Sequence, residues 1–366
     1  MKRHQLLFVL FLLLISYKSN AQAPNWLWAK SFGSNGDEMN YSITIDSSGN
    51  IYATGEFNGT IDFDPGPGIY NMSSSTGASV FIVKMDPYGN FIWARTFSGF
   101  GSSGLSIAVD AAENVYTTGK FYATVDFDPG PGVFNLTAST NPDIFISKLD
   151  ASGNFVWAKA LLNTHISGAP PFLAISLAID NTSGAVYING PYSGTVDFDP
   201  STSGTFTITS IGSSDIFTLK LDSLGNFIWA KSYGSPAYSS AKGITLDPSG
   251  NVYCVGEFTG TVDFDPGTTV YNITGAGSID IFITKLNSAG NFIWGKSLGG
   301  TNMDIVYAIT SDLDGNIYTT GDFGGIADFD PGVGTYNIQA AGSDDYFVSK
   351  LDPLGNFVWA KAFGGM

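Results

Sequence analysis

The chain has 366 residues, of which 43% are hydrophobic and 14% aromatic, so it can bury a large core and is not disordered as a whole. Only 13% of the residues are charged, and 45 Gly with 16 Pro favour turns and strands over helices. The formal net charge of −16 argues against a nucleic-acid partner, while one Cys and two His exclude an intramolecular disulfide and a histidine-rich metal centre.

Residues 1–21 are predicted to be a secretory signal peptide. Two basic residues precede an apolar run from Leu6 to Ile15, which is too short to anchor the chain in a bilayer. The small residues Ser19 and Ala21 favour cleavage after Ala21. We therefore expect an exported mature chain with no membrane span after cleavage.

An internal repeat of about 65 residues organises the remaining chain, residues 22–366. Six tryptophans mark it at spacings of 65, 64, 72, 65 and 65 residues: Trp28, Trp93, Trp157, Trp229, Trp294 and Trp359. Five successive units are predicted, approximately at residues 34–98, 99–162, 163–234, 235–299 and 300–366.

Each unit carries two hairpin turns, as at residues 46–50 and 86–90. Asp begins each of these turns, and Gly takes the left-handed position before Asn, as a type I turn with a bulge requires. Two hairpins per unit predict four strands. The stretch from Asp62 to Met72 predicts an additional short hairpin between the second and third strands, and no stretch after the signal peptide has a helical period.

The strands predict an all-β fold. In the run from Phe91 to Ala94 both alternating sets of side chains are apolar, which predicts that both faces of the sheet are buried. Four-stranded sheets stacked around an axis achieve this, so we predict a β-propeller with five complete blades. A β-solenoid is the alternative, although its coils usually have only roughly 20 to 30 residues. A glycine recurs in the second strand and predicts close backbone approach or a bulge, at Gly55, Gly119, Gly190, Gly256 and Gly321.

One tryptophan strand is in excess, because residues 25–32 precede the first unit. Either five blades close and this strand joins a sheet edge, or the chain is part of a propeller with six or more blades. Residues 361–365 resemble the start of another repeat, which favours the second interpretation.

The series from Asp143 to Lys159, which returns from Asp280 to Lys296, resembles the bacterial secreted β-propeller repeat family called SBBP. The resemblance covers approximately Asn25 to Phe363. It implies a propeller on an exported, often cell-surface bacterial protein, and it implies no catalytic residues.

Most charged residues occupy fixed places in the repeat, which leaves few for a unique site. Glu56, Glu257 and Asp322 share a register that is occupied in the other units by Lys120 and Pro191. Paired carboxylates at a channel mouth suit a glycosidase-like mechanism, but ion-paired or solvated acids are the favoured interpretation.

His165 and Cys254 are the other potentially reactive side chains. His165 lies in the insertion of the long third unit, within residues 161–172, and no nearby residue is marked as a nucleophile, so a surface histidine is favoured. Cys254 takes the place of Ala53, Thr117, Ile188 and Thr319 in other units and is predicted to be a packing residue.

Each unit contains an Asp-Phe-Asp-Pro loop, with the acids Asp62 and Asp64, Asp126 and Asp128, Asp197 and Asp199, Asp263 and Asp265, and Asp328 and Asp330. The two carboxylates of an extended pair lie about 7 Å apart on one side, and flanking carbonyls could complete a calcium site. The favoured alternative is structural, because Asp before Pro-Gly initiates turns. No other cofactor is expected.

These patterns predict a secreted, non-enzymatic binding or scaffolding module with a protein or glycan ligand. The alternative is an extracellular hydrolase or lyase that acts on a polysaccharide through acids at the channel mouth.

Overall fold

A computed structural model of the chain describes residues 27–33, 36–139, 142–162, 164 and 175–365. The predicted signal peptide, His165 and most of the predicted insertion lie outside the described residues. Every regular element within them is a β-strand. Among these residues, none forms a helix with the length and hydropathy of a transmembrane segment.

Each repeat unit builds four main strands. The first unit has β1 (Glu38–Ile45), β2 (Ile51–Asp62), β3 (Asn71–Met85) and β4 (Phe91–Gly99). The second has β5 (Ser103–Val109), β6 (Val115–Phe121), β9 (Asp143–Leu149) and β10 (Phe155–Leu161). The third has β11 (Ser176–Ile179), β12 (Val186–Tyr192), β15 (Asp215–Leu221) and β16 (Phe227–Tyr233). The fourth has β17 (Ser239–Leu246), β18 (Val252–Phe258), β21 (Asp280–Leu286) and β22 (Phe292–Gly300), and the fifth has β23 (Asp304–Ser311), β24 (Ile317–Asp328), β25 (Asn337–Leu351) and β26 (Phe357–Phe363).

Within each unit the four strands pair antiparallel in chain order. An additional short hairpin lies between the second and third strands. It is formed by β7 (Thr124–Asp126) with β8 (Asn135–Thr137), β13 (Thr195–Asp197) with β14 (Thr207–Thr209), and β19 (Thr261–Asp263) with β20 (Asn272–Thr274). In the first and fifth units, the outer ends of β2 and β3 and of β24 and β25 form it.

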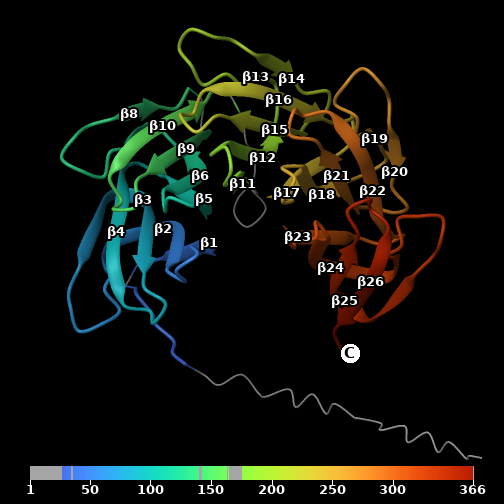
Figure 1. Cartoon of the computed structure of the whole chain (residues 1–366), viewed down its shortest axis with the longest axis horizontal. Coiled ribbons are helices and arrows are strands. Elements are labelled where there is room, and N and C mark those ends of the chain that lie inside the picture. The colour runs from blue at the N-terminus through green and yellow to red at the C-terminus, as the bar shows by residue number, and fades with distance from the viewer. Residues whose placement is uncertain (1–26, 34–35, 140–141, 163, 165–174, 366) are drawn as a thin grey trace, which may run out of the picture.

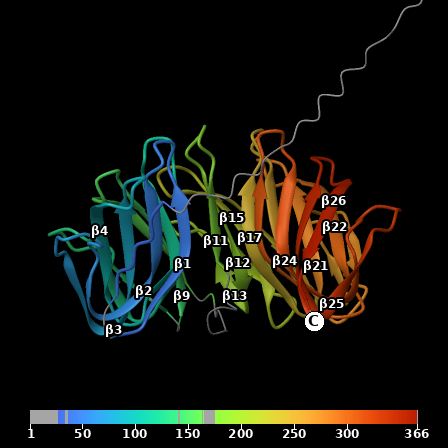
Figure 2. The same ribbon diagram turned by 90° about the horizontal axis from the view of Figure 1, so that it is seen from below.

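The sheets stand side by side around a common axis, with the first strand of each unit innermost and the fourth outermost (Figure 1). Seen from the side, the strands run along that axis (Figure 2). Successive innermost strands β1, β5, β11, β17 and β23 contact one another. This radial arrangement is that of a β-propeller, and it confirms the predicted all-β class.

The first and last sheets do not meet, so the described chain forms an open arc (Figure 1). Ile43 on β1 is 64% exposed, whereas its counterpart Ile107 is 5% exposed against the preceding sheet. Phe363 on β26 is 59% exposed, whereas its counterpart Phe97 is fully buried. Part of one face of each terminal sheet is therefore exposed.

Local side-chain contacts explain why the predicted turns form. In the first turn Asp46 Oδ1 accepts hydrogen bonds from the backbone N–H groups of Ser48 and Asn50, and Oδ2 accepts one from the Tyr52 hydroxyl. Lys84 lies over the Tyr52 ring with its Nζ 5.0 Å from the ring centre. The same lysine–tyrosine contact recurs in each of the other four units, so these lysines are part of the framework.

The repeated tryptophan joins each unit to the next. The indole N–H of Trp93 donates to the Ala151 carbonyl at 3.2 Å, and a methyl group added to Gly153 would lie 3.2 Å from the Trp93 ring. Trp157, Trp229 and Trp294 make the equivalent bond to the following unit. Two features of this turn therefore require glycine: the close packing against the tryptophan ring and the left-handed backbone conformation.

The excess tryptophan strand uses the same contact. Trp28 donates to the Pro87 carbonyl of the first unit at 3.3 Å, and Phe32 packs against Phe63 and Phe81. Residues 27–33 form no β-ladder. They therefore occupy the place that the outermost strand of a preceding unit would take.

We expect deletion of residues 22–33 to lower the melting temperature, because the deletion uncovers Phe63 and Phe81. Trp28→Ala in the full chain should reproduce part of the loss, whereas Leu27→Ala should not, since Leu27 is exposed. Thermal unfolding followed by circular dichroism measures the effect. An unchanged melting temperature after the deletion would show that this packing contributes nothing.

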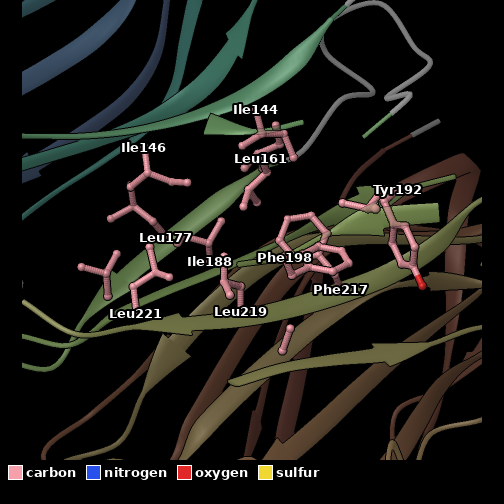
Figure 3. Packing of buried hydrophobic residues seen from close by; sticks show 14 of the residues in the cluster. Ile144, Ile146, Leu161, Leu177, Ile188, Tyr192, Phe198, Phe217, Leu219 and Leu221 are labelled. Carbon is pink, nitrogen blue, oxygen red and sulfur yellow. The ribbon is translucent and has the colours of Figure 1, made fainter. Parts of the chain in front are cut away.

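The hydrophobic core lies in layers between neighbouring sheets. One layer combines Ile144 and Ile146 of the second unit with Ile188, Phe217 and Leu219 of the third (Figure 3). Three further clusters fill the equivalent spaces between other neighbouring sheets. A fourth lies on the first sheet, where Phe32 packs against it. Burial between sheets is the main stabilising term of such a fold.

The outermost strands correct one expectation. Both faces were predicted to be buried, but Ile92 is exposed while Trp93 and Ala94 are buried. The register shifts between Phe91 and Trp93, so a β-bulge inserts one residue and turns it towards solvent. The equivalent side chains are also exposed, at Val156, Ile228, Ile293 and Val358.

Candidate functional site

Glu56, Glu257 and Asp322 lie at equivalent positions on the second strands of their units. In the ladders between second and third strands, Glu56 pairs with Val80, Lys120 with Ile144, Pro191 with Ile216, Glu257 with Ile281 and Asp322 with Tyr346. The five positions are thus structurally equivalent, but the residues at them are not. Such unequal positions on equivalent strands are where a repeat protein can carry a unique site.

In the innermost strand of the unit, a β-bulge places a second side chain near this position. The register skips Tyr41, Leu105, Lys242 and Tyr307 in the four units where the first strand is fully described. Bulges commonly redirect side chains beside functional sites. Sequence reasoning missed these partners, although a constant separation of 15 residues links Tyr41 to Glu56, Lys242 to Glu257 and Tyr307 to Asp322.

Glu56 lies between the first and second units. Its carboxylate accepts a hydrogen bond from the Ser103 hydroxyl. Burial, followed by the charge of Glu56, raises the pKa of Tyr41 to about 12. Lys120 is buried nearby, and burial lowers its pKa while the Glu56 charge acts in the opposite direction.

Glu257 is only 3% exposed and lies beside Lys242, with 3.4 Å between Lys242 Nζ and Glu257 Oε1. The Tyr238 hydroxyl donates to Oε2 at 3.4 Å. Burial raises the pKa of Glu257, Lys242 opposes that rise, and the charge of Asp322 adds to it. The favoured sequence interpretation, an ion-paired acid, therefore describes Glu257.

Asp322 accepts a hydrogen bond from the Tyr307 hydroxyl at 3.0 Å. Burial and Asp322 together raise the pKa of Tyr307 to about 12. Tyr238 and Tyr307 are both exposed, and their rings lie beside Glu257 and Asp322. We call these four residues the axial cluster. The structure thus brings Glu257 and Asp322 into one cluster, while Glu56 interacts with Ser103 and Lys120.

The Asp-Phe-Asp loops use their carboxylates to hold the loop backbone. Asp62 Oδ1 accepts hydrogen bonds from the N–H groups of Asp64 and Tyr70, and Asp64 Oδ1 accepts one from Gly66. The same pattern recurs at Asp126 and Asp128, Asp197 and Asp199, Asp263 and Asp265, and Asp328 and Asp330. In the described part of the chain, no group of three or more His, Cys, Asp or Glu side chains is arranged for a metal ion.

Calcium binding by these loops stays a prediction. If the loops are structural turns, a chelator should leave the melting temperature unchanged, because backbone N–H groups already use one oxygen of each acid. If calcium binds, the chelator should lower the melting temperature and calorimetry should detect several equivalent weak sites.

A hollow with a volume of about 710 Å³ lies on the outer edge between the second and third units. It is lined by residues of both units, among them Phe134, Thr137, Lys159, Asp199 and Thr202. A smaller hollow of about 360 Å³ lies between the first and second units, beside Arg95 and the loop that starts at Asp128. We call the larger hollow the outer groove.

Aromatic pairs recur along the outer edge. Tyr70 packs on Phe91 with 4.7 Å between ring centres, and Phe134 packs on Phe155 at 4.8 Å. The equivalent pairs are Phe206 with Phe227, Tyr271 with Phe292 and Tyr336 with Phe357. The first ring of each pair is exposed, so the edge presents one aromatic surface per unit.

Cys254 is fully buried and contacts the Thr218 hydroxyl at 3.3 Å. Burial raises the pKa of its thiol to about 12. A buried thiol of this kind is a packing residue, as the sequence predicted.

Comparison with known proteins points to repeat proteins. An uncharacterized WD repeat-containing protein of Acanthamoeba polyphaga mimivirus is 24% identical over 93% of this chain and 29% of its own length. The regulatory protein FlaEY of Caulobacter vibrioides is 25% identical over 56% of this chain and 20% of its own length. The chain thus spans less than a third of these curated relatives. With the radial sheets, the first of them supports a propeller-type repeat protein.

Two solved structures overlap with this chain in part. A protein of unknown function from Bacteroides caccae is 10% identical, covers 77% of this chain and 90% of its own, and gives a TM-score of 0.29. A glucose dehydrogenase is 11% identical, covers 80% of this chain and 96% of its own, and gives a TM-score of 0.33. No family model matches the sequence.

Proposed function

We propose that the chain is a secreted, non-enzymatic binding or scaffolding module of a bacterial cell surface, built as a propeller with five complete four-stranded blades of the SBBP type. Its ligand is a glycan or a protein bound along the outer edge. Glu56, Glu257 and Asp322 each form a hydrogen bond or an ion pair with a neighbouring side chain, which supports a binding role over catalysis.

The outer groove carries this proposal. Its volume of about 710 Å³ is in the range of ligand sites, and it combines an aromatic ring, hydroxyl groups, a lysine and carboxylates. Aromatic faces with nearby polar groups suit sugar rings and amphipathic side chains. The aromatic pairs repeat in all five units, so an extended ligand can gain affinity by contacting several of them at once.

An array of glycans and proteins probed with the chain from residue 22 onward tests the proposal. We expect at least one class of binder, with affinity reduced at least tenfold by Thr202→Arg, because the new side chain fills the groove and changes its charge. Leu224→Arg is the matched control, since Leu224 is exposed on a turn outside the groove. Equal binding by the two variants would refute the assignment to the groove.

A polysaccharide-acting hydrolase or lyase is the second candidate. It is supported by the exposed rings of Tyr238 and Tyr307 beside Glu257 and Asp322, and by the raised pKa of Glu257, which suits a general acid. Release of reducing ends or unsaturated products from polysaccharides would favour it if Asp322→Asn abolished the release and Asp344→Asn did not.

A further inference from the structure

Two buried acids meet at the joint between the fourth and fifth units. Asp280 is the first residue of β21 and Asp304 is the first residue of β23. Asp280 is 1% exposed and Asp304 is fully buried. Neither belongs to the axial cluster or to the outer groove.

Each carboxylate has one oxygen engaged and one free. Asp304 Oδ2 accepts a hydrogen bond from the Gly300 N–H at 2.7 Å, and Asp280 Oδ2 accepts one from Gly277 at 3.0 Å. The Oδ1 atom of each is buried without a hydrogen-bond partner. A buried carboxylate oxygen without a partner is costly, so these two atoms require an explanation.

The two side chains converge on the backbone of Gly299. A methyl group added there would lie 2.5 Å from Asp280 Oδ1 and 2.7 Å from Asp304 Oδ2. The two carboxylates are therefore within about 5 Å of each other. At this separation, in a buried site, ionising both is strongly unfavourable.

Two other joints in the described part of the chain carry a serine in place of Asp304. Ser102 and Ser239 take the place of Asp304 in the second and fourth units, as the equivalent bonds of Ser102 and Asp304 to the preceding unit show. Ser102 accepts a hydrogen bond from the Val80 N–H, and Ser239 donates one to the Ser214 carbonyl. A neutral hydroxyl thus takes the place of Asp304 at these two joints. Glu38 holds the equivalent position in the first unit, and that of the third unit lies outside the described residues.

We propose that one proton held at the site where Asp280 and Asp304 meet makes the contact between the fourth and fifth units a pH-sensitive joint. With the proton present, only one of the two buried carboxyl groups carries a charge. Without it, two anions face each other and loosen the contact of β23 with the fourth unit.

The surrounding charges support this assignment. Asp322 on β24 acts on Asp304 as a second negative charge, and Asp344 on β25 lies beside Gly324, next to the partner of Asp304 in the ladder. Burial first, then the charge of Asp280, raises the pKa of Asp304 to about 7, and burial raises the pKa of Asp280. The folded chain therefore binds a proton that the unfolded chain releases near pH 4, so this contribution to stability is full below that pH and is lost as the pH rises through about 7.

Thermal unfolding between about pH 5 and pH 8 tests the joint in the full chain. Asp304→Ser introduces the residue that the second and fourth units carry. We expect the melting temperature of the natural chain to fall by several degrees over this range relative to Asp304→Ser, whose own profile should be flatter. The protection factors of the β23 amides, which correct for the intrinsic rise of hydrogen exchange with pH, should fall with pH in the natural chain and stay constant in the variant.

Asp304→Asn and Asp280→Asn supply independent variants, and each should flatten the profile in the same way. Asp314→Asn removes an exposed acid on the turn that follows β23, away from the joint, and should leave the profile unchanged. Parallel profiles for the natural chain and all three joint variants would overturn the proposal. It would also be wrong if added Ca²⁺ at pH 8 stabilised the natural chain but not Asp304→Ser, since a cation would then neutralise the pair.

Discussion

Replacing Phe217 by Ala is expected to lower the free energy of unfolding by about 3–5 kcal/mol. Phe217 on β15 is fully buried, and its ring centre lies 5.0 Å from that of Phe198 and 6.3 Å from that of Tyr192. These rings fill the layer between the second and third sheets (Figure 3). Truncation removes this packing and leaves a cavity that the paired strands around it cannot collapse.

Denaturant unfolding measures this loss. Ile228→Ala on the outermost strand β16 is the control, because Ile228 is exposed, and we expect a change of less than about 0.5 kcal/mol. A loss below about 1 kcal/mol for Phe217→Ala would contradict the layered packing.

Replacing Gly256 by Val is expected to cost more than about 4 kcal/mol or to prevent folding. A Cβ atom at this position would lie 2.0 Å from the carbonyl oxygen of Ser240 and 2.6 Å from the Phe282 ring. The oxygen belongs to a paired strand next to a bulge, so relief requires breaking the ladder between β17 and β18.

Gly295→Val is the matched comparison for this variant. Gly295 also lies within a strand, β22, but the three atoms nearest to an added Cβ belong to the side chains of Ile273, Tyr271 and Phe292, at 3.1 to 3.5 Å. Side chains can shift, so we expect a clearly smaller loss, measured by soluble yield and denaturant unfolding. Equal losses at the two positions would show that backbone contact is not the cause.

The site could be predicted only in part from the sequence. The common level of Glu56, Glu257 and Asp322 followed from the repeat register, and the ladders confirm it. Their partners did not follow, because Tyr41, Lys242 and Tyr307 reach the acids through bulges that alternation does not reveal. The burial of Glu257 likewise depends on how the fourth and fifth sheets pack.

Local chemistry determined most of the architecture. Most of the hairpin turns depend on an Asp side chain and a glycine within five residues, although Asn287 replaces the Asp in one turn and Glu113 the glycine in another. The sequence alone therefore indicates these turns and the number of strands per unit. The tertiary structure decided what distant segments do to one another. It turned Ile92 outward, placed Trp28 on the first unit, and brought Asp280 to Asp304 across 24 residues. These outcomes depend on the register between paired strands and on packing between neighbouring sheets, and no residue pattern within one strand encodes either.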